Sequence, residues 1–151
     1  MKKKIFLSER HISIKVFKLN GRAFVEATLL DSDHLIRLTM VVNPAEKKII
    51  KAKAEMPHSP FGICPQTVKK VKNLEGLIIG KGVMSKIVEA VGGPCGCIHL
   101  RDLTSEAVSK VAGDLVGYED GHSPFSQEPK AIHFKQTEEE LRNTCLAYKQ
   151  G

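Results

Sequence analysis

The chain has 151 residues, of which 42% are hydrophobic, a length typical of one domain and a composition that supports a buried core rather than disorder. No apolar run approaches the roughly 20 residues of a membrane span, and the basic start Met1–Leu7 lacks the apolar stretch of a secretory signal. The net charge of +6 is spread along the chain, and two Tyr with no Trp offer little for base stacking. We therefore expect a single cytoplasmic domain over 1–151, with no membrane partner and no nucleic-acid partner.

The first half of the chain alternates apolar and polar residues with a period of two, which is typical of strands with one buried face. Strands are expected over about 11–56: His11–Leu19, Arg22–Asp31, Leu35–Val42 and a fourth that ends near Met56. Asn20-Gly21 joins the first two, because this pair favours a tight hairpin turn. Short links between four strands predict an antiparallel meander. Ile12, Ile14 and Val16 alternate with polar residues in the first strand, and Ala23, Val25, Ala27 and Leu29 share one face of the second. The side chains expected to face inward are Ile36, Leu38, Met40, Val42, Ile50, Ala52, Ala54 and Met56.

After a loop rich in Pro and Gly, the period becomes that of helices, which are expected over about 64–116. A short helix begins near Cys64-Pro65, a second ends at Gly92-Gly93-Pro94, and the longest runs roughly from Ile98 to Val116. A mobile loop and a C-terminal helix are expected over about 117–151. The predicted fold class is α+β, an antiparallel meander of about four strands covered by C-terminal helices. The expected apolar stripes are Val83, Met84, Ile87, Val88 and Val91 on the second helix, and Leu100, Leu103, Ala107, Val111 and Leu115 on the third.

Metal-ligand residue types occur where the sheet and the helices are expected to meet. His34 opens the third strand, Cys64 stands at the junction of loop and helix, and Cys97 and His99 begin the long helix. The dipole and free N–H groups of a helix N-terminus favour a thiolate. Thiolate and imidazole ligands together suit zinc or iron. The spacing of Cys95 and Cys97 is not that of a zinc finger.

Each of these residues also has a structural interpretation. His34 could be a solvated loop residue, and Cys64 could be a buried filler. Cys97 and His99 could instead act as nucleophile and base, although the sequence supplies no recognisable third member. The roles of Cys95 and Cys145 stay open.

The chain resembles a bacterial domain-of-unknown-function family, the one catalogued as 2889. The resemblance covers nearly the whole chain and implies no settled function. The features that carry it are Gly21–Asp31, His34–Leu38, Cys64-Pro65, Leu74-Glu75-Gly76, Gly96–Leu100 and a Cys near Cys145.

Residues 33–111 also resemble, more weakly, the iron–sulfur cluster scaffold family of NifU/IscU type, and the expected fold is similar to the SufE/NifU fold. Two of the three scaffold cysteines are replaced here, by Ser32 and Leu100. The resemblance implies a mononuclear metal site formed by His34, Cys64, Cys97 and His99.

We expect from these observations that the protein binds a zinc or iron ion, or an iron–sulfur species, through these Cys and His side chains. One alternative is a small enzyme that uses the same pocket, either metal-assisted or thiol-based. Another is an interaction module that binds other proteins without chemistry at this site. The sequence does not set the oligomeric state.

Overall fold

The structure is a computed structural model that describes residues 3–117, 142–143 and 149. The strands are β1 (Arg10–Leu19), β2 (Arg22–Asp31), β3 (Leu35–Asn43) and β4 (Lys48–His58), and the helices are η1 (Cys64–Leu74), α1 (Val83–Val91) and α2 (Ile98–Gly117). The chain divides at Val111 into two units, and the first, Met1–Val111, contains the sheet, η1, α1 and α2 as far as Val111. Among the described residues, no helix has the length and apolar character that crossing a membrane requires.

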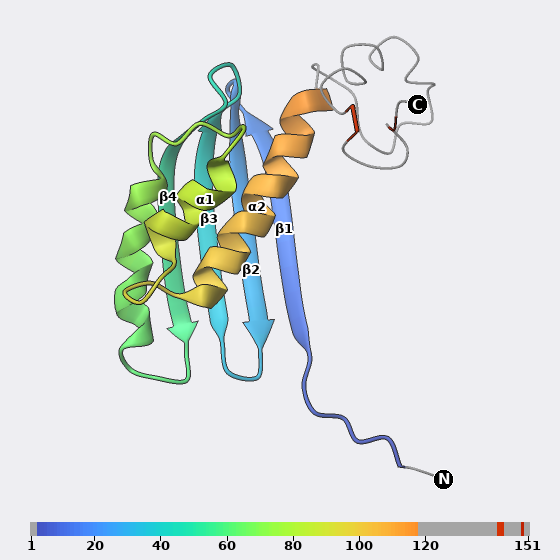
Figure 1. Ribbon diagram of the computed structural model, residues 1–151, viewed down its shortest axis with the longest axis vertical. Coiled ribbons are helices and arrows are strands. Elements are labelled where there is room, and N and C mark those ends of the chain that lie inside the picture. Colours follow the sequence, from blue (N-terminus) through green and yellow to red (C-terminus); the bar gives the residue numbers. More distant parts are fainter. Residues whose placement is uncertain (1–2, 118–141, 144–148, 150–151) are drawn as a thin grey trace. The chain divides into compact units, whose positions relative to one another are not determined.

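The four strands form one antiparallel sheet in the order β1-β2-β3-β4, so each strand pairs with its neighbour in the sequence (Figure 1). Asn20 and Gly21 have φ angles of 50° and 70°, the positive values that a primed two-residue turn requires. This turn sets Arg10 opposite Asp31 at the far end of the hairpin. The predicted meander and its first turn are confirmed.

A bulge in β4 changes which isoleucine faces the core. Val42 pairs with Ile49 and Val41 pairs with Lys51, which leaves Ile50 as the extra residue. Ile49 is fully buried and Ile50 only half-buried. The prediction that Ile50 faces inward was therefore wrong, because strict alternation does not allow for a bulge.

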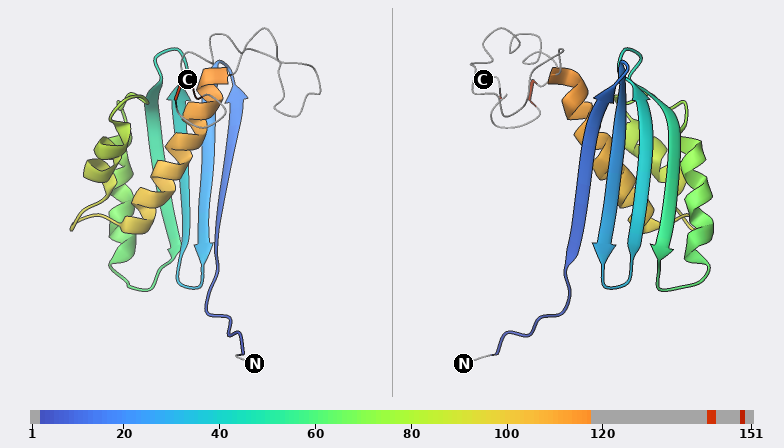
Figure 2. Two further views of the ribbon diagram at one scale, coloured as in Figure 1. Left: turned by 45° about the vertical axis from the view of Figure 1, so that its right-hand side comes forward. Right: turned by 180° about the vertical axis from the view of Figure 1, so that it is seen from behind.

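The helices lie on one face of the sheet, and the view from behind shows the strands in front of them (Figure 2). The first helix, η1, is a 3-10 helix. It is tied to β4 by Glu75, which accepts hydrogen bonds from the Ala52 backbone N–H at 3.0 Å and from Lys72 Nζ at 2.9 Å. The hydrogen bonds from Lys72 and Ala52 hold the pKa of Glu75 below its usual value.

The apolar stripe of α1 is narrower than predicted. Val83, Ile87 and Val91 are buried, whereas the side chains of Met84 and Val88 are 43% and 45% exposed. Residues four apart lie one above another on a helix, and the following residue lies about 100° further round it. Met84 and Val88 therefore stand at the edge of the stripe.

The long helix α2 buries the side chains predicted for it as far as Val111. Thr104 is also fully buried, and its hydroxyl donates to the Leu100 carbonyl at 2.7 Å, so this buried hydroxyl is paired. Leu115 is half-buried. The buried side chains of α2 are Leu100, Leu103, Ala107, Val108 and Val111.

These elements confirm the α+β class and the order of strands followed by helices. The loop and the C-terminal helix expected over about 117–151 lie almost entirely outside the described residues. The prediction of a single domain over 1–151 stays a prediction.

Candidate functional site

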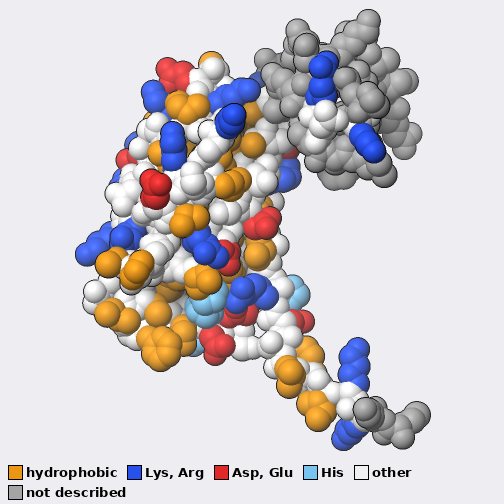
Figure 3. Space-filling model, viewed as in Figure 1, with side chains coloured by type: hydrophobic (Ala, Val, Ile, Leu, Met, Phe, Trp, Pro, Cys, Tyr) orange, Lys and Arg blue, Asp and Glu red, His pale blue; other side chains and the backbone are white. Residues whose placement is uncertain are grey.

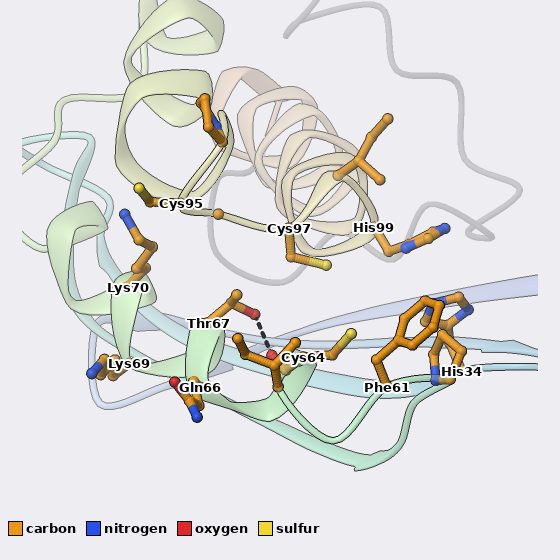
Figure 4. A pocket seen from close by; sticks show the side chains of 15 residues that line it. His34, Phe61, Cys64, Gln66, Thr67, Lys69, Lys70, Cys95, Cys97 and His99 are labelled. Carbon is orange, nitrogen blue, oxygen red and sulfur yellow. Dashed lines mark hydrogen bonds between the residues drawn. The ribbon is translucent and has the colours of Figure 1, made fainter.

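A pocket of about 510 Å³ lies between η1 and the start of α2, next to the turn that joins β2 and β3. Three segments far apart in the sequence line it: His34 from the β2–β3 turn, the Pro60–Lys70 region, and Pro94–His99 (Figure 4). All four predicted ligands, His34, Cys64, Cys97 and His99, are among its lining residues.

His34 is held in place by Asp31, three residues earlier. The imidazole Nδ1 donates to Asp31 Oδ1 at 2.9 Å, and the backbone N–H of His34 donates to the same oxygen at 2.8 Å. A carboxylate only accepts hydrogen bonds, so Nδ1 carries the proton and Nε2 is the atom left for a ligand. His34 is 7% exposed, and this pairing satisfies Nδ1 of its buried ring.

Asp31 also binds Arg10, whose Nη2 lies 2.7 Å from Asp31 Oδ2. Burial of the Asp31 carboxyl would raise its pKa, but hydrogen bonds from His34, the Asp33 backbone N–H and Arg10 outweigh burial and hold that pKa well below its usual range. Asp31 therefore stays ionised and keeps the His34 ring fixed.

His99 lies against His34, with ring centroids 3.9 Å apart and ring planes tilted by 40°. Burial lowers the pKa of His99, and electrostatic interaction with His34 and Arg10 lowers it further, against the opposite effects of Asp31 and Asp102. His99 is therefore a neutral imidazole at pH 7 and can accept a proton or bind a metal ion.

Cys64 is positioned by the turn that begins η1. Its backbone N–H donates to the Phe61 carbonyl at 3.1 Å, and its carbonyl accepts the Thr67 hydroxyl at 2.7 Å. Pro65 then occupies the first turn of the helix, where a missing N–H costs nothing. The Cys64 thiol is half-buried in the pocket.

Cys97 is positioned by the loop between α1 and α2, which folds back on the end of α1. The Cys97 N–H donates to the Val91 carbonyl at 2.9 Å, and the Gly96 N–H donates to the Gly93 carbonyl at 3.0 Å. A Cβ atom on Gly96 would collide with the carbonyl oxygens of Val91 and Gly92. The glycines therefore allow the close approach that brings Cys97 and His99 into the pocket.

Figure 4 shows both thiols directed toward the end of the pocket where the two imidazoles lie. Cys64, Cys95 and Cys97 are all free thiols. Cys95 is exposed and points away from Cys97, on the side of Lys70 (Figure 4). Within the described part of the chain, no three Cys, His, Asp or Glu side chains already stand in an arrangement that would hold a metal ion. The structure therefore brings the four predicted residues to one pocket, and their metal-binding role stays a prediction.

Asp31 and Arg10 are site residues that the sequence interpretation missed. The signal for Arg10 was present, because a two-residue turn at Asn20-Gly21 fixes the hairpin register and sets Arg10 opposite Asp31. The signal for Asp31 was the polar run Asp31–His34, in which an Asp side chain can cap the N–H groups that follow it.

The fold and the site together define an α+β domain with a pocket of thiols and imidazoles at one end of its sheet. A family model described as "Protein of unknown function (DUF2889)" matches residues 8–112. The chain belongs to this family, and the match includes every strand and all four predicted ligands. Comparison with curated proteins and with solved structures gave no match. The resemblance to the SufE/NifU fold therefore stays a prediction.

Proposed function

We propose that the protein binds a zinc or iron ion through His34, Cys64, Cys97 and His99. The observation that carries this proposal is that these four side chains, two thiols and two imidazoles, come from three separate segments and line one pocket. Two sulfur and two nitrogen donors form a set that suits zinc and iron. Reorientation of the side chains is part of the proposal, because no three donors within the described residues are arranged for a metal ion.

The Asp31–His34 pair supports the proposal. Metal-binding histidines commonly donate their second ring N–H to a carboxylate, which fixes the tautomer and makes the free nitrogen a better ligand. His34 has this arrangement, with Nδ1 donating to Asp31 and Nε2 left over. His99 supports it too, because only a neutral imidazole binds a metal ion and its pKa is lowered.

The replaced scaffold positions favour a single ion over a cluster. Ser32 and Leu100 stand where two cysteines of the iron–sulfur scaffold family would fall, so fewer thiolates are present than such a cluster uses. When bound, the ion would supply either a structural cross-link or Lewis acidity. A closed four-ligand site would indicate structure or carriage, and an open position would indicate catalysis.

The test is metal analysis of the full chain, purified anaerobically without chelators and without a metal-affinity tag. We expect about one equivalent of zinc or iron, and its loss in Cys64→Ala and in Cys97→Ala. Cys95→Ala is the matched control, because this thiol points away from Cys97 (Figure 4). Cys145→Ala is a second control, at a position outside the described residues. Unchanged metal content in Cys64→Ala and Cys97→Ala would show that these thiols are not the ligands.

Asp31→Asn tests the support that Asp31 gives to His34. This change keeps the shape of the side chain but removes the charge that holds the imidazole proton. We expect affinity for Zn²⁺ to fall by about 10–100-fold, as is typical for partners of metal-binding histidines. A competition titration with a chromophoric chelator measures the change. Glu55→Gln, at an exposed ion pair on β4, is a control that should leave affinity unchanged.

A second candidate function is thiol-based catalysis in the same pocket. The observation that favours it is a neutral imidazole, His99, two residues from Cys97 in the sequence and in contact with the ring of the His34–Asp31 pair. Such an imidazole can act as general base for a thiol nucleophile. A metal-free preparation separates the two candidates. If iodoacetamide alkylates Cys97 rapidly in the original protein and more slowly in His99→Gln, the thiol-based function is supported. Equal alkylation rates in the two proteins would contradict it.

A further inference from the structure

The mouth of the pocket is apolar and exposed. Phe61 and Ile63, in the loop before η1, are both 68% exposed, and Ile98, at the start of α2, is 57% exposed. All three line the pocket that holds the thiols and imidazoles. A cluster of large exposed apolar side chains around a polar site is typical of a surface that another group covers.

The segment before β1 carries a second exposed apolar cluster. Ile5, Phe6 and Leu7 are consecutive, and their side chains are 73%, 76% and 88% exposed. Figure 3 shows hydrophobic side chains both along this segment and at the lower end of the domain beside a histidine. The basic residues Lys3 and Lys4 precede the cluster, so the segment begins with positive charge and continues with three apolar side chains.

The two clusters are attached close to each other. Arg10 begins β1 and binds Asp31, and Asp31 in turn holds His34 in the pocket. Phe6 lies four residues before Arg10, so an extended chain lets it reach up to roughly 13–14 Å from that anchor. Because Asp31 and His34 connect Arg10 to one edge of the pocket, the apolar segment is tethered beside that edge.

We propose that the Ile5–Leu7 segment folds over the mouth of the pocket and covers Phe61, Ile63 and Ile98, so that it acts as a strap over the site. Closure removes apolar surface of both clusters from water. It also restricts access of water and small reagents to Cys64 and Cys97. The proposal does not depend on whether the pocket binds a metal ion.

The test is the rate of thiol alkylation in the full-length protein, measured by mass spectrometry with iodoacetamide in the presence of a chelator. The test variant is Ile5→Ser/Phe6→Ser/Leu7→Ser, and the matched control is Lys3→Ser/Lys4→Ser, which leaves the apolar run intact. These side chains are exposed, so neither variant should disturb folding. Cys95, which is exposed and lies on the Lys70 side of the pocket, pointing away from Cys97, is an internal reference in every sample.

We expect Cys64 and Cys97 to react about threefold faster or more in the variant with three serines at positions 5–7. This factor corresponds to a closed form that comprises about two thirds or more of the original molecules, because only the open form then reacts. Cys95 should react at the same rate in all three proteins. Equal rates at Cys64 and Cys97 in the variant with three serines at positions 5–7 and in the original protein would overturn the proposal. Protection that increases with protein concentration would also overturn it, because the covering segment would then come from a second copy.

Discussion

Gly96 lies so close to the end of α1 that no side chain fits at this position. A Cβ atom there would collide with the carbonyl oxygens of Val91 and Gly92. The same carbonyl of Val91 accepts the Cys97 N–H, so the close approach and the position of the thiol depend on each other. The glycine next to Cys97 is thus part of the site, although it has no functional group.

Gly96→Ala tests this close approach. We expect a loss of about 1–3 kcal/mol in the free energy of unfolding, because the added methyl group must push two backbone carbonyls apart. Urea unfolding measures it. The matched control is Gly80→Ala, where no atom lies within 4 Å of the added Cβ and φ is not positive, so the free energy should change by less than about 1 kcal/mol. Equal effects of the two substitutions would contradict the packing described here.

The residues that line the pocket were easier to predict than their arrangement. His34, Cys64, Cys97 and His99 were recognisable because they are metal-ligand types that the predicted strands and helices bring to one edge. Asp31 was not, because an Asp in a polar turn has many ordinary roles and only the folded turn shows that it binds the His34 ring. The contact between the rings of His34 and His99 could not be predicted either, since it depends on packing between segments far apart in the sequence.

At the scale of elements, α2 contributes the most continuous buried stripe of the helical layer. Leu100, Leu103 and Val111 have no exposed surface, and Figures 1 and 2 show the helix on the same face of the sheet as α1. The same helix begins with the residues that line the pocket. Its packing therefore determines where His99 lies.

Leu103→Ala should lower the free energy of unfolding by about 2–5 kcal/mol, because it leaves a cavity in a fully buried layer. Glu106→Ala, one turn further along α2 on an exposed face, is the matched control and should cost less than about 0.5 kcal/mol. Thermal or urea unfolding followed by circular dichroism measures both. A stable Leu103→Ala protein would mean that this face of α2 does not pack as described.

The elements themselves were largely predictable, because period two and period 3.6 are distinct signals over ten or more residues. The predicted strands and helices agree with β1–β4, η1, α1 and α2. The errors lie where local geometry departs from a regular repeat. The bulge at Ile50 places Ile49 in the core instead of Ile50. Met84 and Val88 stand at the edge of the apolar stripe of α1 and are therefore partly exposed.

At the scale of the molecule, the ionisable groups of the site make stability depend on pH. The pKa of His99 is lowered in the folded state from 6.5, so below that pH the unfolded chain binds a proton that the folded chain resists. The pKa of Asp31 is lowered from 3.8, so the stability it contributes is present above that pH and is lost on further acidification.

We therefore expect the free energy of unfolding to fall in two steps as the pH decreases, the first below about 6.5 and the second below about 4. Urea unfolding between about pH 8 and pH 3 measures both steps. His99→Gln should remove the first step and keep the second. A free energy of unfolding that stays constant between about pH 7 and pH 5 would show that His99 is not buried against His34 as described.

The contact between the imidazoles of His34 and His99 joins two points that lie 65 positions apart in the chain. Each strand of the meander pairs with its neighbour in sequence, so the sheet can form from successive hairpins at a small entropic cost. The contact between His34 and His99 closes a far longer loop. An ion held by both rings would be a removable link across that loop, and because it binds the folded chain rather than the unfolded one, it would stabilise the fold by its binding free energy. Metal loading would then slow unfolding, and stripping the ion would restore the faster rate.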